Sequence, residues 1–198
     1  MKQHINIKCD GDKKLAVYKD ALAKYEKCDV KLFTIKEKNW EQIPPDMKKE
    51  CKNINYCVYV IKCDESDEVE IIKMFDKNKE KHDEEKETRK YCISKKNQKN
   101  IDEKIKSKTE KSGNVLYVGS KVKDLYSRLA NHLGLNKNSR RTYSLYIKDW
   151  WTNEGKTTFT IDVYVVKDIN QEQLQFIEDL IWEHEKPLFG KEGPNSAN

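Results

Sequence analysis

Residues 115–132, with the sequence VLYVGSKVKDLYSRLANH, hold the side chains of this chain that are best suited to chemistry. A strand ending in Tyr117-Val118-Gly119 is followed by a short loop and then by a helix. Arg128 and His132 are four residues apart, so they are neighbours on one face of that helix. An exposed tyrosine at a strand end, an arginine and a histidine together suit the handling of a phosphate group. The chemistry that they suggest is phosphodiester cleavage.

Positive charge is concentrated around this segment. The net charge of the chain is only +5, but residues 113–150 carry seven basic and two acidic side chains. Such a stretch is typical of a surface that binds a polyanion. The alternative is an ordinary solvated surface in a lysine-rich protein. The basic residues that we expect to contact DNA are Lys123, Lys137, Arg140, Arg141 and Lys148.

The composition indicates one globular domain. A chain of 198 residues with 36% apolar residues can build one core with some decoration. No stretch approaches the roughly 18 apolar residues of a membrane span, and the N-terminus lacks the apolar run of a signal peptide. We therefore expect a soluble, cytoplasmic protein. Six cysteines occur without a CxxC pair, which predicts reduced thiols.

The first half of the chain predicts one helix, two strands and an insertion. Apolar residues at three- and four-residue steps predict an amphipathic helix over 13–27, and residues 30–35 are typical of a short strand. Residues 56–61 (YCVYVI) are apolar on both faces, which favours a strand in the middle of a sheet. Residues 64–112 are highly charged and balanced in sign. They predict an insertion that is part helix and part mobile loop.

The second half predicts strands that alternate with helices. VLYV predicts a buried strand, and the helix after it starts at Asp124 or a neighbour and ends at Gly134. Residues 158–166 predict a third strand, and Asn170 with Gln173 has the capping-box pattern of a last helix. The expected fold class is α/β (α+β), with a small, mainly antiparallel three-stranded sheet flanked by helices. We expect one domain over 1–198, comprising an N-terminal extension (1–55), a charged insertion (64–112) and a catalytic core (113–190).

Five elements of the sequence together resemble the GIY-YIG nuclease superfamily in residue type and order: Cys57-Val58-Tyr59, Tyr117-Val118-Gly119, Arg128, His132 and Glu178. The match covers roughly residues 56–190. Cys57 stands where the family has glycine, whereas both tyrosines are kept. In most members a short hairpin joins the two tripeptides, but here 57 residues separate Tyr59 from Tyr117. A long insertion at this point is similar to those of restriction-type members.

The resemblance implies a role for each residue. Arg128 would hold the scissile phosphate with two-pronged donors, and Lys121 would meet the phosphate or a base. Tyr117 resembles the family tyrosine that deprotonates water, and Tyr59 is the second candidate. A phenol could act as this base only if cations nearby lower its pKa.

The resemblance also implies roles for the other two residues. His132 would bond the phosphate or accept a proton. Glu178 resembles the family glutamate that binds a divalent cation, and a single carboxylate suits Mg²⁺ (or Mn²⁺), which keeps most of its waters. For each residue the structural alternative is a core aromatic or a solvated side chain.

The function that the resemblance implies is metal-dependent cleavage of double-stranded DNA. A sequence-specific endonuclease of the restriction type is the first hypothesis, with base contacts from the insertion and the N-terminal segment. One site per chain would require a homodimer or sequential nicking to cut both strands. The alternatives are a structure-selective repair or recombination nuclease, and a nucleic-acid-binding module without activity.

Overall fold

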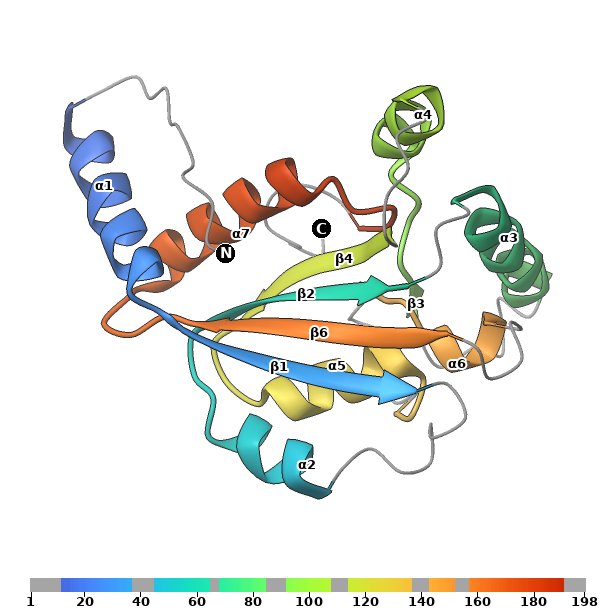
Figure 1. The fold of residues 1–198 in the computed structure, drawn as a ribbon, viewed down its shortest axis with the longest axis horizontal. Coiled ribbons are helices and arrows are strands. Elements are labelled where there is room, and N and C mark those ends of the chain that lie inside the picture. Colours follow the sequence, from blue (N-terminus) through green and yellow to red (C-terminus); the bar gives the residue numbers. More distant parts are fainter. Residues whose placement is uncertain are drawn as a thin grey trace.

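A four-stranded antiparallel sheet forms the centre of the computed structural model, in the order β1-β6-β2-β4 (Figure 1). The structure describes residues 12–36, 45–64, 68–84, 92–107, 114–136, 143–151 and 157–190. The strands are β1 Asp29–Lys36, β2 Cys57–Cys63, β3 Cys92–Ile93, β4 Asn114–Lys121, β5 Tyr143–Ser144 and β6 Thr158–Val165. The helices are α1 Asp12–Glu26, α2 Pro45–Lys52, α3 Glu68–Glu84, α4 Gln98–Ser107, α5 Leu125–Leu133, α6 Ile147–Trp150 and α7 Gln171–Glu185.

The sheet confirms the expected fold class, with one more strand than expected. The apolar run at 56–61 lies inside the sheet as β2, which pairs with β4 on one side and β6 on the other. The fourth strand is β1, which pairs with β6 along its whole length. Part of the segment expected to be an N-terminal extension is therefore built into the sheet, because β6 offers a second edge for pairing.

Alternation along β2 divides the apolar residues between two cores, one on each face of the sheet. Tyr59 and Ile61 belong to the larger core, together with residues of α2, α3, α5 and α6. Val58 and Val60 belong to the smaller core, which α1 and α7 cover. The helices α1 and α7 therefore lie on one face of the sheet, and α5 lies on the other (Figure 1).

The described part of the charged insertion is packed into the larger core. Its helix α3 buries Ile71 and Phe75 completely. The Phe75 ring contacts Trp150 of α6 and Phe189, with centroids 5.4 Å and 4.4 Å apart. The predicted helical part of the insertion is confirmed by α3 and α4. The sequence did not locate the predicted mobile loop within the insertion, and residues 65–67, 85–91 and 108–112 of the insertion lie outside the described residues.

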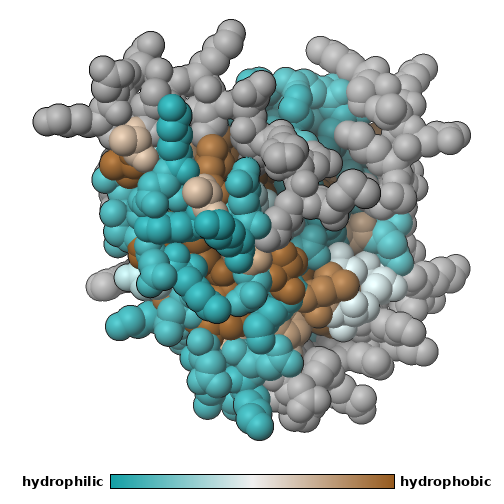
Figure 2. All heavy atoms as spheres, turned by 60° about the vertical axis from the view of Figure 1, so that its left-hand side comes forward, coloured by the Kyte–Doolittle hydropathy of each residue, from teal (hydrophilic) through white to brown (hydrophobic). Residues whose placement is uncertain are grey.

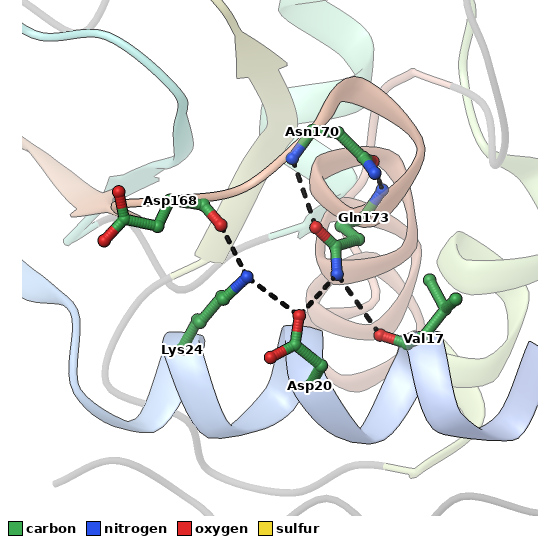
Figure 3. A network of polar contacts seen from close by, with 6 residues as sticks. All are labelled: Val17, Asp20, Lys24, Asp168, Asn170 and Gln173. Carbon is green, nitrogen blue, oxygen red and sulfur yellow. Dashed lines mark hydrogen bonds and ion pairs between the residues drawn. The ribbon is translucent and has the colours of Figure 1, made fainter.

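Polar contacts fix the start of α7 to α1 (Figure 3). Asn170 and Gln173 form the predicted capping box. The Gln173 side-chain amide also donates to Asp20 of α1 at 2.8 Å, and Lys24 binds the same carboxylate at 2.8 Å. These contacts hold the helix that carries Glu178 against the N-terminal segment.

The surface and the cysteines complete the description of the fold. The side of the molecule that carries α1 shows hydrophobic residues among hydrophilic ones (Figure 2). No described helix is long and apolar enough to cross a membrane. Cys28, Cys51, Cys57 and Cys63 are buried free thiols, as predicted. Cys9 and the side chain of Cys92 lie outside the described residues.

Candidate active site

Two tyrosines lie side by side on the face of the sheet that α5 covers. In the antiparallel register of β2 and β4, Tyr59 is opposite Gly119, and Ile61 is opposite Tyr117. The two tyrosine rings are 6.3 Å apart and nearly parallel. A Cβ atom on Gly119 would lie 2.6 Å from the Tyr59 hydroxyl and 2.8 Å from Cε1 of Tyr117. The glycine of the second tripeptide is therefore required by the close approach of both rings.

Arg128 connects the two tyrosines from the middle of α5. Its Nε donates to the Tyr59 hydroxyl at 2.9 Å, and one terminal nitrogen donates to the Tyr117 hydroxyl at 3.1 Å. The other terminal nitrogen donates to Oγ of Ser144 in β5 at 2.7 Å. Three of the five N–H groups of the guanidinium are engaged in these bonds. They hold the guanidinium in one orientation and leave one N–H on each terminal nitrogen.

The charge of Arg128 is buried without a carboxylate in contact with it among the described residues. The side chain is only 8% exposed, and all three hydrogen-bond acceptors are hydroxyls. Burial opposes the charge, but Tyr59 and Tyr117 favour it, and the pKa of Arg128 stays above its ordinary value. A buried cation is costly unless an anion accompanies it. The arrangement is therefore suited to an anionic ligand.

His132 lies behind Tyr59 and is completely buried. Its Nδ1 accepts a hydrogen bond from the backbone N–H of Leu145 at 3.2 Å. The proton of a neutral imidazole is then on Nε2, which lies 3.1 Å from the Tyr59 hydroxyl and donates to it. Burial and the charge of Arg128 hold the pKa of His132 well below its usual value. His132 is therefore a neutral hydrogen-bond donor that orients Tyr59.

The two tyrosines are not exposed, so that part of the sequence prediction is wrong. Tyr59 is completely buried, and Tyr117 is 2% exposed. Burial raises the pKa of the Tyr59 hydroxyl, and this effect outweighs the opposing effect of Arg128. Both described neighbours of the Tyr59 oxygen donate to it. Tyr59 is therefore a protonated phenol in this state.

Glu178 approaches the site from the other face of the sheet. It lies on α7, is 6% exposed, and is hydrogen-bonded by the side chain and backbone of Ser120 at the end of β4. Burial raises the pKa of Glu178 to about 7; the bonds from Ser120 and the charge of Arg128 limit the rise. Because β4 is the edge strand, groups from both faces meet around it. The structure thus brings Glu178 within electrostatic range of Arg128 and Tyr59.

The basic residues predicted to bind DNA are more dispersed. Lys121 is half-buried at the end of β4, and its carbonyl oxygen accepts from the thiol of Cys57 at 3.6 Å. Lys123 is exposed just before α5, and Lys148 is exposed on α6 beside Gly134, which ends α5. Lys123 and Lys148 therefore lie near opposite ends of α5. The predicted contacts at Lys137, Arg140 and Arg141 fall outside the described residues.

Ser144 and its neighbour Leu145 are site residues whose contacts with Arg128 and His132 the sequence did not predict. Both belong to the segment after α5, where Ser144 holds Arg128 and the Leu145 amide holds His132. The insertion braces this segment, because β3 pairs with β5 in parallel and the backbone N–H of Ser94 donates to the Ser144 carbonyl at 2.9 Å. The serine of a YSL sequence carries no local signal of this role. Only the fold reveals it.

Gly190 packs against the far side of Tyr117. A Cβ atom there would lie 3.0 Å from Cε2 of the Tyr117 ring, and the residue has φ of +96°, a conformation that favours glycine. The backbone N–H of Gly190 donates to the Lys95 carbonyl at 2.8 Å. The insertion, the segment after α7 and β4 therefore meet at Tyr117.

The side chains at the site could supply one carboxylate ligand to a metal ion, that of Glu178. The described residues contain no group of three or more His, Cys, Asp or Glu side chains that could hold a metal ion together. Glu178 is the carboxylate that lies at the site, hydrogen-bonded by Ser120. One carboxylate suits Mg²⁺, which keeps most of its water ligands, but it does not suit the closed cage of a structural zinc.

Comparisons with protein-family models, with curated proteins and with solved structures gave no match. The function is therefore inferred from the geometry of the site and from the sequence pattern.

Proposed function

We propose that this chain is a divalent-metal-dependent DNA endonuclease of the GIY-YIG type. The observation that carries the proposal is the buried guanidinium of Arg128, which three neutral hydroxyls hold and no described carboxylate contacts. A phosphodiester supplies the missing negative charge, and its paired oxygens match the two N–H groups left on the terminal nitrogens. Both tyrosines contact the same guanidinium, and Glu178 interacts with it electrostatically.

The two tyrosines would have different roles. The Tyr59 oxygen accepts from Arg128 and from His132, so its own proton is available to a phosphate oxygen. Tyr59 would then be a hydrogen-bond donor to the substrate, positioned by His132. The Tyr117 oxygen accepts from Arg128 at 3.1 Å, which places this phenol beside the phosphate clamp. The family resemblance assigns the role of general base to Tyr117.

The reaction would be hydrolysis of the P–O3′ bond. In its ionised form Tyr117 takes a proton from water, the oxygen of that water bonds to phosphorus, and the 3′ oxygen leaves and is protonated by solvent. The products are a 5′-phosphate and a 3′-hydroxyl. Arg128 contributes by neutralising charge on the phosphate as it develops. Glu178 would hold Mg²⁺ (or Mn²⁺), which when bound supplies further charge neutralisation at the phosphate.

The substrate would be double-stranded DNA, cut at specific sequences as by a type II restriction enzyme. The N-terminal segment and the insertion, which would have to supply specificity, are joined to the core through β1, α3 and β3. A homodimer would allow one site per chain to cut both strands of a symmetric sequence. A structure-selective nuclease would use the same chemistry on branched or nicked DNA.

A substrate panel and one matched pair of variants test this proposal. Wild-type protein, Glu178→Ala and Glu183→Ala are each incubated with plasmid, linear duplex and branched oligonucleotides, with Mg²⁺ and with chelator. Glu183 is an exposed glutamate on the same helix, so its variant controls for lost charge. We expect Mg²⁺-dependent plasmid fragments from the wild type and Glu183→Ala, and DNA binding without cleavage by Glu178→Ala.

The pattern of products separates the alternatives. Normal cleavage by Glu178→Ala would contradict the assignment of the metal to this residue. Preference for branched DNA would favour the structure-selective nuclease. Binding without cleavage by the wild type under every divalent metal would favour the binding module.

A further inference from the structure

A short helix of the N-terminal segment, α2, lies beside α5 (Figure 1) and has three lysines in its sequence. Lys48, Lys49 and Lys52 are all exposed. The Lys48 ammonium lies 5.6 Å from the centre of the Tyr126 ring of α5. These lysines lie outside the segment whose excess of positive charge indicates nucleic-acid binding in the sequence.

Lys52 of α2 and Lys121 at the end of β4 both lie near Asp124, which precedes α5. Lys52 and Lys121 both contribute to lowering the pKa of Asp124, after the larger effect of its hydrogen bond with Ser127. Residues of two distant segments thus form one surface. We call it the α2 lysine surface, and it consists of Lys48, Lys49, Lys52, Lys121 and Lys123.

The acids near this surface already have partners. Asp124 caps α5 by accepting the backbone N–H of Ser127 at 3.3 Å. Glu50 of α2 is bound by Lys31 of β1 at 3.0 Å. The side chain of Asp46, also in α2, lies outside the described residues. With five lysines against three acids, the surface keeps an excess of positive charge.

This surface begins where the candidate active site ends. Lys121 follows Ser120, which holds Glu178, and lies opposite Cys57 in the sheet. Lys123 and Asp124 lead directly into α5, which carries Arg128. A chain of phosphates that places one group at Arg128 therefore has the lysines of the loop and of α2 beside it.

We infer that the α2 lysine surface binds the phosphate backbone of the nucleic acid on one side of the scissile phosphate. The inference rests on the proposed function and deepens it, because it names how the substrate is held. Lysine ammonium groups are point charges on flexible stems, which suit phosphates rather than base edges. Within the N-terminal segment, the lysines of α2 would thus supply affinity rather than sequence specificity.

Salt-dependent binding of a duplex oligonucleotide tests the inference. Each phosphate neutralised by a lysine releases counterions and adds about 0.9 to the slope of log affinity against log salt. The test variant is Lys48→Gln/Lys49→Gln/Lys52→Gln. The control is Lys167→Gln/Lys186→Gln, which removes two exposed lysines from the two ends of α7, outside the N-terminal segment and the insertion. Anisotropy is measured in chelator, so that cleavage does not interfere.

We expect the α2 variant to bind at least about 10-fold more weakly at low salt, with a slope smaller by roughly two to three units, while the control matches the wild type. Lys49→Gln/Lys52→Gln, which keeps the contact of Lys48 with Tyr126, should lower the slope by up to about two units. An unchanged slope for both α2 variants would overturn the inference, as would an equal change in the control.

The outcomes for the inference and for the proposed function can be told apart. If the wild type cleaves DNA and the α2 variants bind normally, only the inference fails. If binding depends on α2 but no metal supports cleavage, the inference holds and the nuclease proposal fails. If the wild type binds no duplex, both fail.

Discussion

The two faces of the sheet contribute very different halves to the candidate site. On the α5 face, Arg128, Tyr59, Tyr117, His132 and Ser144 are linked by side-chain hydrogen bonds of 2.7–3.1 Å. On the α7 face, Glu178 is held through Ser120, and its pKa is raised to about 7. The first half has a fixed charge and a fixed geometry. The second half has a charge that changes near neutral pH, as suits a group that exchanges a proton for a cation.

The largest loss of cleavage should come from replacing Arg128, which lies at the centre of the hydrogen-bonded group on the α5 face. Arg128→Ala removes the clamp and one hydrogen-bond donor from each tyrosine hydroxyl, so we expect cleavage to fall roughly 1,000-fold or more. Arg128→Lys keeps the charge, but its single ammonium nitrogen lacks the planar fork that reaches the three acceptors, and the variant should lose nearly as much. Single-turnover cleavage measures both, with Lys167→Ala, an exposed lysine without a proposed role, as control. Near-normal activity of Arg128→Lys would mean that charge alone matters.

Removing the hydroxyl of Tyr117 and removing that of Tyr59 should lower the cleavage rate by different amounts. Tyr117→Phe removes the proposed base and should lower the cleavage rate by about 100-fold or more. Tyr59→Phe removes one hydrogen-bond donor and should lower it less, by about 10-fold. Circular dichroism should show both variants folded, because only a hydroxyl is lost. The reverse order of effects would transfer the role of base to Tyr59.

Glu178 should make the stability of the protein without metal depend on pH. The pKa of Glu178 is about 7 in the folded chain, above the ordinary 4.5, so the folded state binds the proton more tightly. Its contribution is fully present below pH 4.5 and is lost as the pH rises through 7. At 1.36 kcal/mol per pKa unit the loss is roughly 3 kcal/mol. Glu178→Gln should remove this part of the pH dependence.

Urea unfolding of wild type and Glu178→Gln in chelator, at pH 5 and pH 8, measures this difference. The variant should gain stability relative to the wild type on going from pH 5 to pH 8. Equal differences at the two pH values would show that Glu178 is not buried as a neutral acid.

An effect as small as that of Tyr59→Phe should come from Ser144, the third hydrogen-bond acceptor of Arg128. Ser144→Ala removes one hydroxyl acceptor of Arg128 while leaving both tyrosine contacts. We expect about a 10-fold fall in the cleavage rate, close to the value of one hydrogen bond to a charged group. Ser144→Thr, which restores the hydroxyl, should recover part of that loss. An equal loss in Ser144→Thr would indicate a packing effect instead.

The helices and strands could be predicted where the information is local. Spacing of apolar residues located α1, and the capping pattern at Asn170 and Gln173 located α7. Partners distant in sequence could not be predicted. The pairing of β1 with β6 joins segments more than a hundred residues apart, and the parallel pair β3–β5 has only two residues in each strand. Neither pairing can be predicted from the sequence of one strand alone.

The candidate site divides in the same way. Arg128 and His132 could be paired from their spacing on one helix, and the family resemblance added Tyr59 and Glu178. Burial of the site could not be predicted, because it depends on β5, α6 and the insertion closing over α5. The predicted exposure of the tyrosine failed for this reason.

The most direct test of the central claim is digestion of unmethylated phage DNA by the wild-type protein, with Mg²⁺ and with chelator, followed by sequencing of the ends. We expect discrete fragments that require Mg²⁺ and carry 5′-phosphate and 3′-hydroxyl ends. Intact DNA under Mg²⁺ and Mn²⁺, at protein concentrations where DNA is bound, would contradict it.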